Sequence, residues 1–120
     1  MVNREAGAGT RRLLDAQLQH LGIQGQHIRG YDDEAQGHLP AAWQVLAGRA
    51  DCCIATRGAA RFGLSFIPLA TERYDLAIRR RHLGLPAVQM LLDTLNRTAF
   101  RRELETLGGY DTTSAGQRRL

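Results

Sequence analysis

The sequence predicts an α/β fold with three layers, in which helices cover a mostly parallel sheet. Apolar segments typical of strands alternate with amphipathic helical segments, and glycine follows several of the helical segments. The chain has 120 residues, which corresponds to at most one domain, and no apolar run reaches the length of a membrane span. All 16 basic residues are arginine, and the net charge of +4 permits an anionic ligand or nucleic acid without requiring either.

The first helix is predicted over residues 10–21, after a short apolar start. Thr10 is of a type that caps helices, and Gly22 is placed to end this one. One face of the helix carries leucine at the spacing expected for packing on a core: Leu13, Leu14, Leu18 and Leu21.

The second helix is predicted over residues 38–47, and Gly48 closes it. Its inward face is expected to consist of Leu39, Trp43 and Leu46. A short helical turn is expected at residues 57–62. Strands are predicted at residues 28–31, 51–55, 64–69 and 74–78.

The last third of the chain predicts two consecutive helices. Pro86 suits the first turn of a helix that carries apolar residues at the i, i+3, i+4, i+7 spacing. A second helix ends at the pair Gly108-Gly109, and residues 111–120 are expected to be a flexible tail. The apolar stripe of the two helices consists of Val88, Leu91, Leu92, Leu95, Phe100, Leu104 and Leu107.

Three helix starts are candidates for an anion site, because free backbone N–H groups and the helix dipole favour negative charge there. Each follows a strand or loop; they are Gly9-Thr10-Arg11, Gly37-His38-Leu39 and Thr56-Arg57-Gly58. In an open parallel sheet such starts converge beyond the carboxyl ends of the strands. The alternative is an ordinary capped surface helix, in which Arg11 pairs with Asp15 one turn along.

Other chemistries receive less support from the sequence. The glycines of residues 7–12 match neither a dinucleotide loop nor a phosphate-binding P-loop, and no metal-ligand spacing is present. Cys52 and Cys53 are adjacent in an apolar strand, which predicts reduced, structural thiols. Two alternatives remain open: an enzyme that uses one of these thiols or His38, and a nucleic-acid-binding module that uses the arginine-rich carboxyl half, including residues 79–81.

Six blocks, in the same order, resemble the periplasmic-binding-protein-like domain related to molybdate- and tungstate-binding proteins. The resemblance extends from Val2 to about Thr112. The blocks are Val2-Asn3-Arg4 through Gly9-Thr10-Arg11, then His38-Leu39, Gly48-Arg49-Ala50-Asp51, Phe66-Ile67-Pro68-Leu69, Glu72-Arg73-Tyr74-Asp75-Leu76 and Leu107-Gly108-Gly109-Tyr110-Asp111.

The resemblance implies a type 2 periplasmic-binding-protein-like lobe that occupies residues 1–112. A full domain of that family has two lobes, and this chain resembles the carboxyl-terminal half. The second lobe would cover about 1–72, and a return strand and helices would cover about 73–109. Such domains are often fused, inside the cell, to a helix-turn-helix DNA-binding domain or a molybdopterin-biosynthesis domain. We therefore expect a cytoplasmic regulator or molybdenum-cofactor protein with no membrane association.

The resemblance also implies non-catalytic binding of a small oxyanion such as molybdate, without a cofactor or metal. The family's ligand contacts correspond here to Ala8, Gly9, Thr10, Arg11, Gly37, His38, Thr56 and Arg57. Three residues depart from the family pattern, which usually has Ser for Ala8, Thr for Gly37 and Gly for Cys53. Weak binding is therefore expected. Because the apolar stripe of the last third would lack its usual cover, a homodimer is also expected.

Overall fold

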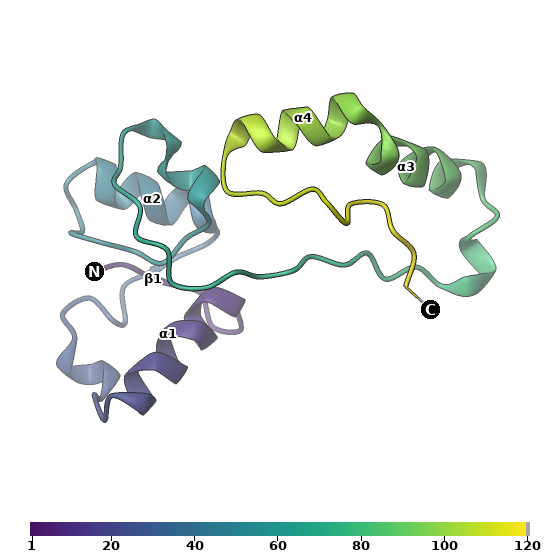
Figure 1. Ribbon diagram of the computed structural model, residues 1–120. Helices are drawn as coiled ribbons and strands as arrows, with labels where there is room; N and C mark the ends of the chain where they lie inside the picture. Colours follow the sequence, from purple (N-terminus) through teal and green to yellow (C-terminus); the bar gives the residue numbers. More distant parts are fainter. Residues whose placement is uncertain (120) are drawn as a thin grey trace. The chain divides into compact units, whose positions relative to one another are not determined.

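The computed structural model describes residues 1–119 (Figure 1). The chain divides into two compact units, Met1–Ile67 and Pro68–Leu120, which we call unit 1 and unit 2.

Unit 1 is built around a very short parallel sheet. Strand β1 (Asn3–Arg4) pairs with β2 (Glu34–Ala35), and Asn3 lies opposite Glu34. Helices α1 (Gly9–His20) and α2 (His38–Leu46) both contact β1, which lies between them in Figure 1. The core of this small assembly consists of Val2, Ala35 and Ala41, with Val45, Ala50 and Cys53 packed against it.

The predicted extended sheet is not formed. Among residues 1–119, the sheet has only the two strands β1 and β2, so the strands predicted at residues 28–31, 51–55, 64–69 and 74–78 are wrong as assigned. Residues 51–55 come nearest to a strand, since the N–H of Val2 donates to the carbonyl of Cys52 at 3.0 Å. A strand requires a ladder of hydrogen bonds to a neighbour, and apolar composition alone does not supply the neighbour.

Helix α1 begins at Gly9, as the glycine and threonine pattern predicts, but its cap differs from the prediction. Ala8 is the N-cap residue and makes no side-chain cap bond, whereas Thr10 lies inside the first turn. The capping role predicted for Thr10 is therefore wrong. Of the predicted inward leucines, Leu18 is buried and Leu21 is 65% exposed. Leu21 is the C-cap residue, beyond the last full turn. A single-turn 3-10 helix η1 (Gly25–His27) follows.

Helix α2 matches its predicted range, but the residues predicted to face inward are exposed. Ala41 and Ala42 are buried, whereas Trp43 is 59% exposed, and Leu39 and Leu46 are exposed as well. The helix is apolar on both sides, so periodicity does not distinguish its two faces. Ala41 packs in the core with Val2 and Ala35, and Val45 of the same helix packs against them. The 3-10 helix η2 (Arg57–Phe62) forms where the helical turn is predicted.

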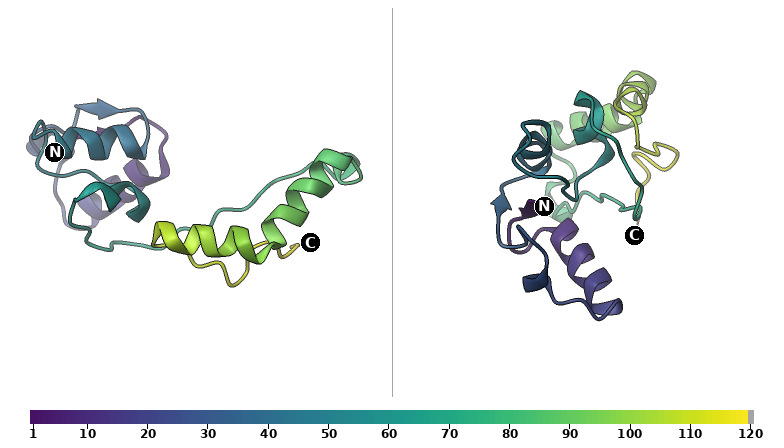
Figure 2. Two further views of the ribbon diagram at one scale, coloured as in Figure 1. Left: turned by 90° about the horizontal axis from the view of Figure 1, so that it is seen from above. Right: turned by 90° about the vertical axis from the view of Figure 1, so that its left-hand side faces the viewer.

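Unit 2 is a helical pair preceded by an extended segment. It contains a 3-10 turn η3 (Arg80–His82) and helices α3 (Pro86–Asn96) and α4 (Thr98–Leu107), which match the predicted helices. Arg97 has an extended backbone and produces the bend between α3 and α4 in Figure 2. The tail up to residue 119 contacts α4, since Arg101 Nη2 donates to the carbonyl of Ala115 at 2.7 Å.

Candidate functional site

The centre of the candidate site is Arg4, whose side chain is almost completely buried at the end of β1. Its Nε and Nη2 donate to the two carboxylate oxygens of Glu5, both at 2.8 Å, in a bidentate ion pair. Its Nη1 lies 2.7 Å from His38 Nδ1. A guanidinium has donors only, so Nδ1 is the acceptor in this contact and carries no proton. Arg4 therefore links the loop before α1 to the first residue of α2.

Two backbone N–H groups complete this cluster. The N–H of Gly37, the N-cap residue of α2, donates to Glu5 Oε2 at 3.2 Å, and the N–H of Thr56 donates to His38 Nδ1 at 3.3 Å. Gly37 has φ +105°, a region that side chains other than glycine rarely adopt, and this conformation directs its N–H toward the carboxylate. We call Arg4, Glu5, Gly37, His38 and Thr56 the polar cluster.

The electrostatics of the polar cluster favour negative charge. The hydrogen bond from Arg4, together with those from the backbone N–H groups of Glu5 itself and of Gly37, lowers the pKa of Glu5 to about 2. Glu5 is therefore ionised at any physiological pH. The structure consequently shows an anionic group held by a guanidinium and by the N-terminal backbone of α2, which is the donor set that an anion site uses.

Thr10 supplies a further polar group close to the start of α1. It is 6% exposed, and its hydroxyl Oγ1 has no hydrogen-bond partner. Within residues 1–119, the N–H groups of Gly9, Thr10 and Arg11 also have no acceptor. Buried polar groups are usually paired, so an unpaired hydroxyl beside a free helix N-terminus is an uncommon arrangement that a bound acceptor would satisfy.

Arg11 has other partners than those that the sequence suggests. Its guanidinium forms an ion pair with Glu34, donates to the carbonyl of Arg4 at 3.1 Å and lies over the ring of Tyr31. Asp15 accepts a hydrogen bond from the Tyr31 hydroxyl at 2.6 Å, so the alternative pairing of Arg11 with Asp15 is not formed. Through its contacts with Glu34 and Tyr31, Arg11 therefore connects α1 to β2 and to the loop before β2.

The structure brings together some of the residues predicted to bind a ligand. The starts of α2 and η2 meet at His38, and the loop before α1 joins them through Arg4 and Glu5. Arg57 is exposed, and within residues 1–119 its side chain has no hydrogen bond or ion pair. The ligand-binding role of all eight residues stays a prediction: Ala8, Gly9, Thr10, Arg11, Gly37, His38, Thr56 and Arg57.

Arg4 and Glu5 are the residues that the sequence interpretation missed. The available signal was an arginine two residues after Val2, directly before an acidic residue and a glycine loop. A charge this close to an apolar strand start implies a partner, because an unpaired buried charge is costly. The partners His38 and Gly37 are more than thirty residues away. Sequence spacing does not reveal such a contact.

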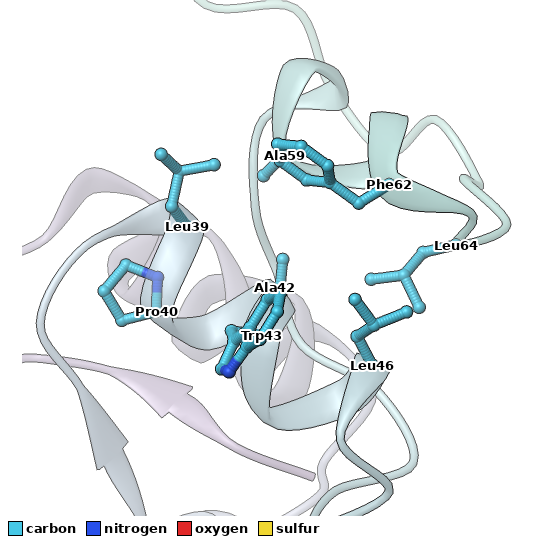
Figure 3. Close-up of a pocket in the computed structure, with 8 residues that line it drawn as sticks. All are labelled: Leu39, Pro40, Ala42, Trp43, Leu46, Ala59, Phe62 and Leu64. Atoms are coloured by element: carbon cyan, nitrogen blue, oxygen red, sulfur yellow. The ribbon is translucent and has the colours of Figure 1, made fainter.

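An apolar groove of about 430 Å³ lies elsewhere in unit 1, between α2 and η2. Figure 3 shows side chains from the two elements facing each other across it. It is lined by Leu39, Pro40, Ala42, Trp43, Leu46, Ala59, Phe62 and Leu64. The groove has no charged lining residue, so it is not suited to an oxyanion.

The structure bears on the other chemistries considered from sequence. Cys53 is half-buried, and burial raises the pKa of its thiol, which disfavours a thiolate nucleophile at this position. Within residues 1–119, no group of three or more His, Cys, Asp or Glu side chains is placed to hold a metal ion.

The arginines of residues 79–81 lie around η3 in unit 2, whereas the polar cluster lies in unit 1. None of the helices described is both long and apolar enough to traverse a bilayer.

Comparison with known proteins identifies one family and two relatives. Residues 1–96 match the family described as a PBP superfamily domain, which is a periplasmic-binding-protein-like domain. The uncharacterized protein YvgK of Bacillus subtilis (strain 168) is 37% identical over 118 residues. That alignment includes 98% of this chain but 38% of YvgK, so the chain spans about two fifths of the length of this relative.

The second relative has a different length. It is an uncharacterized protein encoded in the 5' region of a ferredoxin 2Fe-2S gene of Clostridium pasteurianum, and it is 40% identical over 110 residues. The alignment includes 88% of this chain and 95% of that protein. No solved structure matches the chain significantly.

Proposed function

Because the chain belongs to the PBP superfamily, we propose that it is a non-catalytic binding domain for a small oxyanion such as molybdate. The observation that carries the proposal is the polar cluster, in which Arg4 and the N–H of Gly37 hold one anionic group at the start of α2. The unpaired hydroxyl of Thr10 and the free N–H groups of α1 supply further donors in the same unit. Backbone donors of this kind bind oxyanions without catalytic side chains.

We further propose that the domain senses its ligand on behalf of a larger cytosolic protein, such as a transcriptional regulator or a molybdenum-cofactor protein. A long relative supports this idea, since the region similar to this chain makes up 38% of YvgK. Binding would then act by shifting the balance between conformations of the whole protein, and the ligand must bind one conformation more tightly than the other.

The proposal is tested by titrating the chain with molybdate, tungstate and sulfate while recording amide NMR spectra. We expect dissociation constants of roughly millimolar order, because the donors of unit 1 cover the ligand from one side only. The amide signals of Gly9, Thr10, Gly37 and Thr56 should move together with a single dissociation constant. Arg57→Gln should weaken binding several-fold, because it removes the exposed cation at the start of η2.

Arg49→Gln is the matched control, since it removes the same charge from an exposed arginine that follows the carboxyl end of α2. It should leave the dissociation constant close to that of the original chain. Equal weakening by the two variants would indicate general charge attraction and would contradict the site. A nanomolar dissociation constant would contradict the argument that the site is covered from one side only.

A further inference from the structure

The donors of Arg4 and Gly37 in the polar cluster are already in use, and their occupant belongs to the chain itself. Glu5 accepts from Arg4 Nε and Nη2 at 2.8 Å and from the N–H of Gly37 at 3.2 Å. These are a bidentate guanidinium and a helix N-terminus, which together are the usual donors for a carboxylate or an oxyanion. An external oxyanion would need the same donors.

We propose that Glu5 is a built-in competitor, a carboxylate that occupies the oxyanion position of this domain and must leave before the ligand binds. This inference rests on the proposed function and adds to it a residue that sets affinity. Two like charges a few ångströms apart repel one another strongly where water is partly excluded, so Glu5 and a divalent oxyanion exclude each other from the cluster. Binding is an exchange of one anion for another.

The surroundings of Glu5 allow it to leave without unfolding unit 1. Its side chain is 28% exposed, whereas that of Arg4 is 8% exposed, so the carboxylate lies at the solvent edge of the pair. Ala6 and Gly7, which follow it, are exposed, and the space around Gly7 is open. A rotation of the Glu5 side chain therefore carries the carboxylate into water, while Arg4 remains anchored to His38.

The exchange has a consequence for the wild-type affinity. Every bound oxyanion must first break two charge-assisted hydrogen bonds and one backbone hydrogen bond to Glu5. Only the molecules in which Glu5 has left the donors can bind an oxyanion. The observed affinity is therefore the intrinsic affinity multiplied by the fraction of such molecules, and it is lower than the intrinsic affinity. Removing the charge of Glu5 should therefore strengthen binding, although most substitutions in a binding site weaken it.

The test compares molybdate, sulfate and phosphate binding to the original chain and to Glu5→Gln. Glutamine retains the length of the side chain and one acceptor oxygen but has no charge. We expect Glu5→Gln to lower the dissociation constant for molybdate about tenfold or more. In the original chain, molybdate should also shift the NMR signals of the Arg4 Nε–H and the Gly37 amide, since both groups change their acceptor.

Asp75→Asn is the matched control, because Asp75 also pairs with an arginine, Arg73, at 3.1 Å, but lies in unit 2. It changes the net charge equally and should leave the affinity unchanged. An equal gain in Asp75→Asn and Glu5→Gln would overturn the proposal in favour of a net-charge effect. Glu5→Ala serves as a second variant if circular dichroism shows that Glu5→Gln does not fold.

The outcomes separate this inference from the function on which it rests. If the original chain binds molybdate and Glu5→Gln binds it no more tightly, the competitor role is wrong and the oxyanion function stands. If no oxyanion shifts the amides of unit 1 in the original chain or in either Glu5 variant, the oxyanion function itself is wrong. A tenfold gain restricted to the Glu5 variants supports both.

Discussion

Units 1 and 2 are of similar size, but they are held together by different kinds of contacts. Among the described residues, every buried hydrophobic residue lies in unit 1, and most of these are small: Val2, Leu18, Ala35, Ala41, Ala42 and Ala59. Unit 1 also buries the polar residues Asn3, Arg4 and Thr10. Among the described residues of unit 2 the buried residue is Thr112, and α3 leaves the large apolar side chains of Met90 and Leu91 exposed.

The difference indicates which part of the chain can hold a binding site in a fixed geometry. A site needs side chains whose positions are fixed by packing and by supporting hydrogen bonds. Unit 1 provides both through its alanine core and the polar cluster. Unit 2 provides regular helices but little packing: the residues of its apolar stripe are half-buried, apart from Leu91, which is exposed.

The largest expected effect that follows from this comparison is self-association through unit 2. We expect light scattering to show the apparent mass rising toward that of a dimer as the concentration increases, because α3 exposes the side chains of Met90 and Leu91. Leu91→Glu should shift this rise to higher concentration. Glu103→Gln, at an exposed position of α4, is the control and should have little effect. A compact monomer at high concentration, with Leu91 and Leu95 protected, would contradict the proposed homodimer.

A second prediction concerns the free energy of unfolding of the two units. The side chain of Ala41 in α2 is completely buried against Val2 and Ala35. Ala41→Leu should therefore lower the free energy of unfolding by about 1–3 kcal/mol through overpacking. Ala87→Leu introduces the same side chain at an exposed position of α3 and should change it by less than about 0.5 kcal/mol. Urea unfolding measures both values. Equal losses would show that unit 2 is packed as tightly as unit 1.

The sequence predicts the helices well, because helical periodicity and stop residues are local. Pro86, Gly108 and the apolar spacing between them locate both helices of unit 2. The strands fail because pairing is not local, and an apolar segment such as residues 74–78 contains no information about its neighbour. The inward face of α2 fails because apolar residues such as Ala41 and Trp43 lie on more than one side of the helix, and only Ala41 packs in the core.

The candidate site shows the same division between local and distant information. Glycines and a threonine mark the starts of α1, α2 and η2, and these starts were predicted correctly. The contacts that join them involve Arg4 and Glu5, whose partners lie more than thirty residues away. Local sequence reasoning therefore locates the elements of the site but not the ion pair at its centre.

The smallest expected effect concerns the N-caps of α1 and α3, one in each unit, which lack a side-chain hydrogen bond. Ala8 caps α1 and Leu85 caps α3, and neither makes a side-chain cap bond. Ala8→Ser and Leu85→Ser each add a hydroxyl that can accept from the N–H of the second or third helical residue. Each should raise the free energy of unfolding by up to about 1 kcal/mol, as measured by urea unfolding.

The two caps differ in what lies beside them. Position 8 directly precedes the first turn of α1, which contains the buried Oγ1 of Thr10 and the free N–H groups, so a hydroxyl there can donate to an oxyanion bound at this helix start. Ala8→Ser should therefore tighten molybdate binding a few-fold, whereas Leu85→Ser should leave it unchanged, because the start of α3 has no comparable unpaired hydroxyl within residues 1–119. If both variants stabilise the chain and neither changes the affinity for molybdate, α1 is an ordinary surface helix and its start takes no part in oxyanion binding.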